Sequence, residues 1–267
     1  MRKLFFIFIF LLYSIQINAA SYTFGVVPQF EEENLKRMWD PFINYLNKQT
    51  GNNFIFKTTK SIVDFETNLS KGLYDFVYLT PSEYIKFHRS QGYSAFAKVK
   101  DLKLRWIVFA TNNSHISSIN DLSHRQVLFP ELDSPIIINP LKTLEKKGIN
   151  VTPIYIKTHE EIYNSVSQSL YNVGIGIDHT FKIMPNSVRS NLKIIWTSDS
   201  FQPNAFASHP RVPFDVVDNL RNVLINIADT DDNRMILDTI RFCTGFEVAK
   251  DSDWNSIREM EIKNDKE

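Results

Sequence analysis

The sequence predicts a two-lobed α/β protein in which each lobe is a mostly parallel sheet flanked by helices. Short apolar runs alternate with segments whose apolar residues recur at helical spacing. Such alternation is typical of βαβ units and of parallel sheets. It pauses at a polar stretch, residues 111–115, and starts again at residue 126. Two rounds of the same pattern indicate two similar lobes.

The first twenty residues have the pattern of a secretory signal peptide. Arg2 and Lys3 precede an unbroken apolar run over residues 4–13, and the segment closes with the small residues Ala19 and Ala20. The run is shorter than the roughly 20 apolar residues of a membrane-spanning helix. We therefore expect residues 1–20 to be removed and the mature protein to work outside the cytoplasm. An uncleaved N-terminal anchor is the alternative.

The predicted elements of the first lobe are strands made of apolar runs and helices with one apolar face. Several of the helices stop at a glycine, a frequent helix-ending residue. In chain order the predicted elements are a strand at 22–28, a helix at 35–46, a strand at 53–58, a helix at 62–69, a strand at 75–79, a helix at 81–87 and a strand at 104–110.

The second lobe repeats the alternation, and the chain then returns. The predicted elements are a strand at 126–129, a helix at 135–147, a strand at 154–156, a helix at 160–170, a strand at 173–177, a short helix near Phe181, a strand at 192–196, a returning strand at 204–207 and two final helices near 220–227 and 235–240. We therefore assign residues 21–110 and 205–267 to lobe 1 and residues 111–204 to lobe 2.

The composition excludes some classes of partner and cofactor. The 30 basic and 30 acidic residues balance, whereas binding to nucleic acid requires a basic excess or stripe. Cys243 is the only cysteine, so no internal disulfide is expected, and we interpret it as a small buried residue. His179 follows Asp178, but no third ligand has the spacing of a metal site. We expect no nucleic-acid partner, no metal and no cofactor.

Candidate ligand-binding residues lie at the ends of predicted strands, because open α/β sheets bind ligands beyond the carboxyl ends of their strands. Several of them begin helices, where free N–H groups favour an anion. Alternatively, the hydroxyl residues only cap their helices, and the histidine faces solvent. The candidates are Tyr78, Thr80, Ser134, His159 and Asp178.

We predict no catalytic residues. The chain has no nucleophile elbow, no Ser–His–Asp order, no glycine-rich phosphate loop and no paired-carboxylate signature. A hydrolase that uses His159 or His179 as a base is an alternative, but no nucleophile can be placed beside either residue.

The order and spacing of many segments resemble the periplasmic phosphate/phosphite/phosphonate-binding proteins that feed ABC transporters. The resemblance covers nearly the whole mature chain, although no single segment is specific. The segments that carry it are 24–27, 34–36, 39–42, 72–76, 119–122, 126–129, Leu144 with Gly148, His159 with Glu160, 192–198, 245–248 and 251–254.

The resemblance implies a type 2 periplasmic binding fold with a ligand cleft between two lobes. It also implies a periplasmic protein that captures a small polar solute and delivers it to a membrane permease. A sensor-input protein that docks on a signalling receptor is an alternative, as is a lobe protein that binds only another protein. We expect a monomer.

One segment departs from the resembled family, which has a Ser-Thr-Ser-Gly stretch that holds the phosphonate oxygens. Here the place reads Leu132-Asp133-Ser134-Pro135-Ile136, and only Ser134 is kept. Asp133 would repel an anion, and Pro135 has no N–H to donate. His159 and Tyr78 match a histidine and an aromatic residue of the family. We therefore expect a solute less charged than a phosphonate dianion, or one with a cationic group, and a phosphonate-like oxyanion stays a candidate.

Overall fold

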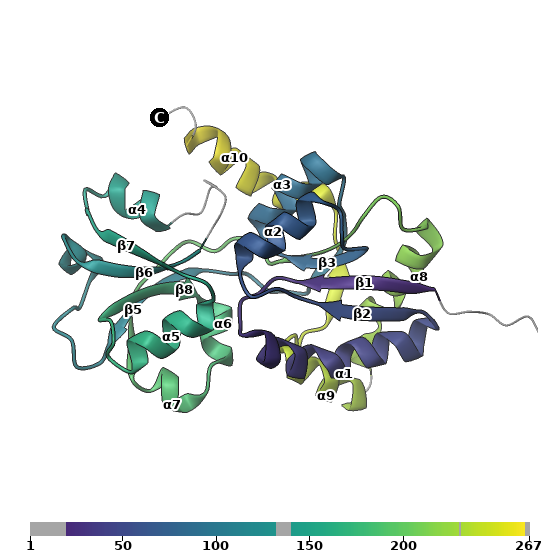
Figure 1. Cartoon of the computed structure of the whole chain (residues 1–267), viewed down its shortest axis with the longest axis horizontal. Coiled ribbons are helices and arrows are strands. Elements are labelled where there is room, and N and C mark those ends of the chain that lie inside the picture. The colour runs from purple at the N-terminus through teal and green to yellow at the C-terminus, as the bar shows by residue number, and fades with distance from the viewer. Residues whose placement is uncertain (1–19, 132–139, 230, 265–267) are drawn as a thin grey trace, which may run out of the picture.

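Two sheets lie side by side along the long axis of the molecule, each with helices packed on it (Figure 1). The computed structural model describes residues 20–131, 140–229 and 231–264. The predicted α/β architecture of two helix-flanked sheets is confirmed, and both sheets are mixed. None of the helices within these ranges is long and apolar enough to cross a membrane.

The first sheet has six strands. Strands β1, β2 and β3 are parallel, whereas β10 runs antiparallel to β3 and β4, and β11 runs antiparallel to β4. In spatial order the strands are β11 (Phe246–Val248), β4 (Ser94–Val99), β10 (Ala205–Ser208), β3 (Phe76–Leu79), β1 (Ser21–Val26) and β2 (Asn53–Lys57).

Helices cover both faces of this sheet (Figure 1). On one face α1 (Glu32–Thr50) contacts α8 (Phe214–Ile225) and α9 (Asp231–Ile240). On the other face α3 (Pro81–Gln91) contacts α2 (Ile62–Ser70) and α10 (Asn255–Asn264). The turns η2 (Ile227–Asp229) and η3 (Asp251–Trp254) connect the last elements.

Helix α1 follows directly from its sequence. Glu32 and Glu33 in its first turn oppose the positive end of the helix dipole. Its buried residues all lie on the predicted apolar face, on which Met38 is half-buried. Among the buried residues, Trp39 packs on Phe24 of β1 with ring centroids 6.0 Å apart. Gly51 ends the helix with φ +71°, a conformation that glycine adopts without strain.

The second sheet has five strands. Strand β6 is parallel to β7 and β8, whereas β5 is antiparallel to β8 and β9. In spatial order the strands are β7 (Thr152–Ile156), β6 (Gln126–Pro130), β8 (Val173–Ile177), β5 (Trp106–Thr111) and β9 (Leu192–Thr197). The helical elements are η1 (Ile119–Leu122), α4 (Pro140–Lys146), α5 (His159–Ser167), α6 (Asp178–Ile183) and α7 (Asn186–Arg189).

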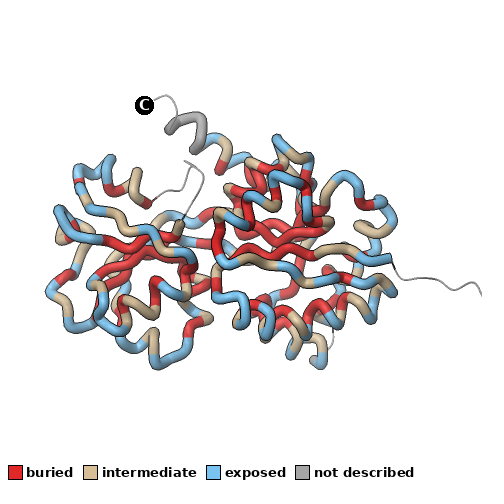
Figure 2. Tube along the Cα trace, viewed as in Figure 1, coloured by how far each residue is buried: buried red, intermediate tan, exposed pale blue. Residues whose placement is uncertain are grey.

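The chain passes from one sheet to the other twice, between β4 and β5 and between β9 and β10. The two crossing segments pair with each other, because Leu104 and Phe201 exchange backbone hydrogen bonds of 3.0 and 2.9 Å. Buried residues run along the strands of both sheets (Figure 2), so each sheet has its own core.

Strand β5 differs from the sequence prediction, which placed residues 104–110 at the end of lobe 1. It pairs with β8 and β9 in the second sheet. All six of its residues are buried, so the apolar run does not show which sheet it joins. The crossing between β4 and β5 contains the largely charged segment 100–103, and it comes before the polar stretch at 111–115.

Two further features differ from the sequence prediction, and a third prediction falls largely outside the described residues. Strands β4 and β11 were not predicted. Cys243 is exposed, because the neighbouring Phe242 takes the inward position, and its thiol donates to Asp238 Oδ1 at 3.0 Å. Only the end of the helix predicted at 135–147 is described, as α4, and Ser134 lies outside the described residues.

Candidate functional site

A cavity lies between the two sheets, beyond the carboxyl ends of β1, β3 and β8. About 60 Å³ of it is open to the centres of water molecules. A single water requires about 10–15 Å³ of such space, so the cavity suits a small solute. Residues of both sheets and of both crossing segments line it: Val27, Gln29, Ile62, Glu66, Thr80, Pro81, Ser82, Glu83, Leu104, Trp106, His159, Ile177, Phe201 and Asn204.

Three helices begin at the cavity. Helix α2 starts at Ile62, α3 at Pro81 and α5 at His159, and all three residues line the cavity. The residue before each helix caps it, as Thr158 does by accepting the Glu161 N–H at 3.1 Å. Because helix N-termini carry partial positive charge, together they favour a negatively charged or oxygen-rich ligand.

Unpaired polar atoms are concentrated in the cavity. Among the buried side-chain nitrogen and oxygen atoms of the described residues, six have no hydrogen-bond partner. Five of them belong to residues that line the cavity, and the sixth is His179 Nε2. Such an atom costs about 1–3 kcal/mol when it stays unpaired. The five atoms are Glu83 Oε1, Trp106 Nε1, His159 Nδ1, Asn204 Nδ2 and Asn204 Oδ1.

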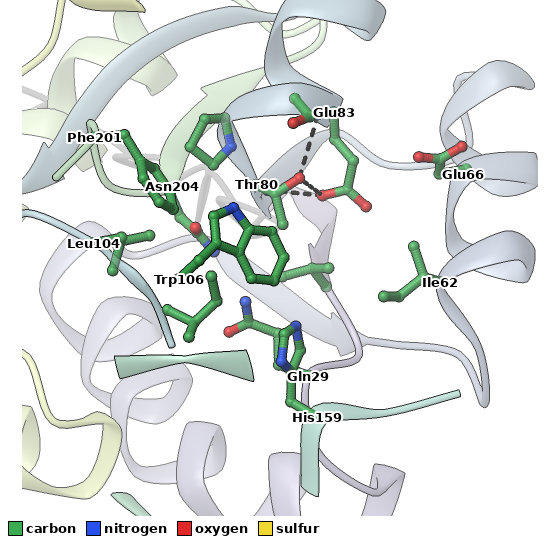
Figure 3. A pocket seen from close by; sticks show the side chains of 14 residues that line it. Gln29, Ile62, Glu66, Thr80, Glu83, Leu104, Trp106, His159, Phe201 and Asn204 are labelled. Atoms are coloured by element: carbon green, nitrogen blue, oxygen red, sulfur yellow. Dashed lines mark hydrogen bonds between the residues drawn. The ribbon is translucent and has the colours of Figure 1, made fainter. Parts of the chain in front are cut away.

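His159 is uncharged in this environment. Its side chain is 3% exposed, and burial lowers its pKa to about 4. Its ring lies against the Trp106 indole, with centroids 6.2 Å apart and planes 30° from parallel. In Figure 3, His159 and Gln29 lie on one side of Trp106, with Thr80 and Glu83 on the other. A neutral imidazole donates from one nitrogen and accepts at the other.

Glu83 is also shifted toward its uncharged form. Burial raises its pKa to about 8, and the nearby Glu66 carboxylate adds to the shift. Hydrogen bonds from Thr80 and the charge of Lys86 oppose it. Lys86 pairs with Glu66, with Nζ 2.6 Å from Oε2. Lys86 itself does not line the cavity, and the described lining contains no arginine or lysine. The hydrogen-bond donors of this lining are therefore neutral groups.

Two of the residues predicted from the sequence, Thr80 and His159, line this cavity. Thr80 also caps α3, as the alternative interpretation proposed. Tyr78 lies in a smaller neighbouring hollow with Trp39 and His179. Burial raises the pKa of its hydroxyl, and the nearby Asn204 side chain lowers it by a smaller amount.

Asp178 does not line the cavity. Its Oδ1 accepts the Arg105 N–H at 2.9 Å, and its own N–H donates to the Arg105 carbonyl at 2.9 Å. Asp178 thereby fixes the crossing segment next to Trp106.

The sequence prediction missed several residues of the cavity. Trp106 and Asn204 lie on or beside the crossing segments, and no sequence motif marks such positions. Glu83 was not recognised as a site residue, because a threonine with a glutamate three residues later is an ordinary helix-start pattern. Gln29 follows the first predicted strand and meets the strand-end rule, but it was not chosen as a candidate.

Hydrogen bonds join the two sides of the cleft beside the cavity. Glu160, at the start of α5, accepts the Glu31 N–H at 2.8 Å and the Asn34 Nδ2–H at 2.6 Å. Its own N–H donates to the Gln29 carbonyl at 3.2 Å. The starts of α1 and α5 are thus held together, as expected of a closed cleft.

Comparison with known proteins identifies the family. The model of the family described as "ABC transporter, phosphonate, periplasmic substrate-binding protein" matches residues 24–254. The chain belongs to this family. This binding protein is therefore a periplasmic, solute-capturing component of the ABC-transporter type, and the resemblance stated from the sequence is confirmed. The family carries substrates for transport and is not a family of enzymes. No curated protein sequence matches the chain.

Solved structures share the fold of the binding protein. A binding component of an ABC phosphonate transporter from Pseudomonas aeruginosa superposes with a TM-score of 0.83 at 15% identity, covering 93% of this chain and 87% of that one. PhnD1 from Prochlorococcus marinus, in complex with methylphosphonate, gives 0.82 at 15% identity, covering 94% and 100%. An ancestral arginine-binding protein bound to arginine gives 0.57 at 17%, covering 82% and 97%. The predicted two-lobed binding-protein fold is confirmed.

Proposed function

We propose that the binding protein captures a small, singly charged oxyanion, such as an alkylphosphonate in its monoanionic form, and delivers it to an ABC permease. The observation that carries this proposal is the convergence of five unpaired buried polar atoms on one cavity between the lobes. A ligand oxygen beside Trp106 Nε1 and Asn204 Nδ2 would accept the hydrogen bonds that these donors lack.

The charge of the ligand is argued from the lining. Three helix N-termini and neutral donors favour an oxyanion, but no cationic side chain of the described lining offsets a second negative charge. A monoanion fits this balance better than a dianion, as we expected from the sequence. The family assignment and the methylphosphonate held by the Prochlorococcus protein support a phosphonate as the candidate.

Capture would proceed by closure of the two lobes. The paired crossing segments at Leu104 and Phe201 are the proposed hinge, and the ligand favours the closed state through contacts with both sides. For the site, we propose Thr80 and His159 together with Gln29, Glu83, Trp106 and Asn204. Tyr78 and Asp178 would support its walls, and Ser134 stays a candidate.

The remaining expectations complete the proposal. Residues 1–20 would be removed as a signal peptide during secretion, and the mature chain would act as a monomer without a cofactor. The family assignment favours a permease over a signalling receptor as the membrane partner. Mass measurement of the secreted protein tests the cleavage.

Calorimetric titration with methylphosphonate, phosphite, phosphate and sulfate tests the ligand class. Trp106→Phe keeps an aromatic ring against His159 but removes the N–H donor together with the pyrrole ring of the indole. We expect roughly ten- to hundredfold weaker binding, because a hydrogen bond to a charged group contributes about 1.5–3 kcal/mol. Trp196→Phe, at a tryptophan outside the cavity, is the matched control and should bind normally. Failure of all four probes to bind the wild type would contradict the proposal.

A further inference from the structure

The carboxyl group of Glu83 is held in one orientation. Its Oε2 accepts two hydrogen bonds from Thr80, one from the backbone N–H at 2.7 Å and one from the hydroxyl at 2.8 Å. The Glu83 N–H donates in return to Thr80 Oγ1 at 3.2 Å, which completes a capping box. Figure 3 shows these bonds, with Oε1 turned away from Thr80.

This orientation defines which oxygen carries a proton. Two donors converge on Oε2, so Oε2 is the carbonyl oxygen of the neutral acid, and the hydroxyl is Oε1–H. The side chain is only 2% exposed, and Oε1 has no partner among the described groups. A buried hydroxyl with no acceptor lies at a cavity where a ligand oxygen can supply one.

The charged and titratable groups around Glu83 favour the neutral acid. Glu66 on α2 raises its pKa, whereas Lys86, one turn along α3, lowers it. Among the described residues, the Tyr74 hydroxyl also interacts with Glu83, and the neutral His159 lines the same cavity. The next residue of α3, Tyr84, donates to Asp251, which pairs with His88 and Arg258. The main causes of the shift of the Glu83 pKa are burial and Glu66, and not this second cluster.

Building on the proposed function, we propose that Glu83 is a specificity-determining residue that donates a hydrogen bond from its neutral carboxyl, through Oε1–H, to an oxygen of the bound oxyanion. The donor is available only while the proton stays on Glu83. Ionised Glu83 would place a negative charge beside the anion and exclude it. The cavity therefore distinguishes solutes with an acceptor oxygen from solutes with a cationic group at this position.

The test compares the wild type with Glu83→Gln, in which an amide N–H replaces the acid hydroxyl and cannot ionise. The probe is methylphosphonate, titrated by calorimetry from about pH 6 to pH 9. The ionisation of the probe is common to both proteins, so the ratio of their affinities isolates Glu83. We expect similar affinities at pH 6 and a wild type about tenfold weaker than Glu83→Gln at pH 9, where about a tenth of Glu83 keeps its proton.

Two outcomes overturn the inference while leaving the proposed function intact. One is a ratio that stays constant across the pH range. The other is a wild type that binds methylphosphonate more tightly as pH rises while Glu83→Gln does not, since ionised Glu83 would then not exclude the anion.

A measurement on the unliganded wild type avoids dependence on the variant's folding. Infrared spectroscopy at neutral pH should show the carbonyl band of a buried protonated acid. Its absence overturns the inference even if binding is normal. Absence of binding by methylphosphonate, phosphite, phosphate and sulfate, with the band present, overturns the proposed function instead.

Discussion

At the residue scale, the environment of each side chain sets the charge of the cavity. His159 and Glu83 both titrate outside their ordinary ranges because burial disfavours their charged forms. Neither pKa shift follows from the residue type, since a histidine or a glutamate on the surface would titrate close to its ordinary pKa. Apart from the Glu66 carboxylate, which pairs with Lys86, the described lining is thus built from groups that donate and accept hydrogen bonds without carrying charge.

The buried histidine makes stability depend on pH. The pKa of His159 is about 4 in the folded protein and near 6.5 when unfolded, so the folded state binds fewer protons between these values. Its contribution to stability is complete above pH 6.5 and is lost as pH falls toward 4. We predict that His159→Gln shows a smaller drop in melting temperature than the wild type over this range, measured by scanning fluorimetry.

The control for this experiment is His115→Gln, at an exposed histidine, which should keep the wild-type slope. His179, whose pKa burial also lowers to about 4, should supply the part of the slope that His159→Gln retains. Identical slopes for His159→Gln and the wild type would contradict the assigned shift.

Some site residues could be predicted from sequence and others could not. Thr80 and His159 follow from the rule that ligands bind beyond strand ends, because that rule depends only on local order along the chain. Trp106 and Asn204 reach the cavity through the path of the two crossing segments, a property of tertiary structure. Asp178 satisfied the same rule as His159, yet a backbone N–H of the neighbouring segment occupies its carboxylate.

At the scale of elements, the start of α3 joins folding to the candidate site. Thr80 caps the helix, Pro81 takes the first helical position, and Glu83 closes the capping box. The residues that begin the helix therefore also line the cavity. A local sequence signature predicted the helix start, but the burial of its glutamate depends on packing against α2 and the other lobe.

We predict that Thr80→Ala lowers the free energy of unfolding by about 1 kcal/mol through loss of the cap. It should also weaken binding of methylphosphonate, because the Glu83 carboxyl loses the hydroxyl that orients it. Thr80→Ser keeps the hydroxyl and should restore both properties. Urea denaturation measures the stability, and calorimetric titration measures the affinity. A loss of stability without any change in affinity would show that Thr80 caps the helix but does not contribute to binding.

Strand β8 approaches α5 so closely that its glycines have no room for a side chain. A Cβ at Gly176 would lie 2.2 Å from the Tyr163 hydroxyl, which donates to the Ile177 carbonyl at 2.8 Å. We predict that Gly176→Ala destabilises the protein by about 1–3 kcal/mol through overpacking. Denaturant unfolding measures the loss, and Gly148→Ala, in open space but with positive φ, separates steric overlap from backbone strain.

At the scale of the whole molecule, two features govern opening and closing. The crossing segments are the covalent links between the sheets within the described chain, and Glu160 joins the lobes across the cleft. The sequence showed two lobes through its repeated alternation but misplaced β5, because strand signals record burial and not the identity of the partner strand.

We predict that Glu160→Ala opens the cleft more often. It should accelerate dissociation of methylphosphonate by roughly tenfold, because two charge-assisted hydrogen bonds to Glu31 and Asn34 are lost. Glu161→Ala, at the exposed neighbouring carboxylate, is the matched control. Stopped-flow dissociation gives the rates, and small-angle scattering should show a larger radius of gyration for unliganded Glu160→Ala. Equal dissociation rates in the two variants would show that the Glu160 hydrogen bonds do not hold the cleft closed.

The exposed thiol of Cys243 gives the molecule a natural attachment point for a reporter dye. Its neighbour Phe242 stacks on His179 of the other lobe, with ring centroids 5.9 Å apart, so the thiol lies one residue from a contact that opening would break. The bond to Asp238 raises the pKa of the thiol, so coupling to maleimide should be more complete at mildly alkaline pH. Because the sequence has only this one cysteine, labelling would require no engineered residue. A dye on this native cysteine would therefore report the closure of the two lobes through its fluorescence.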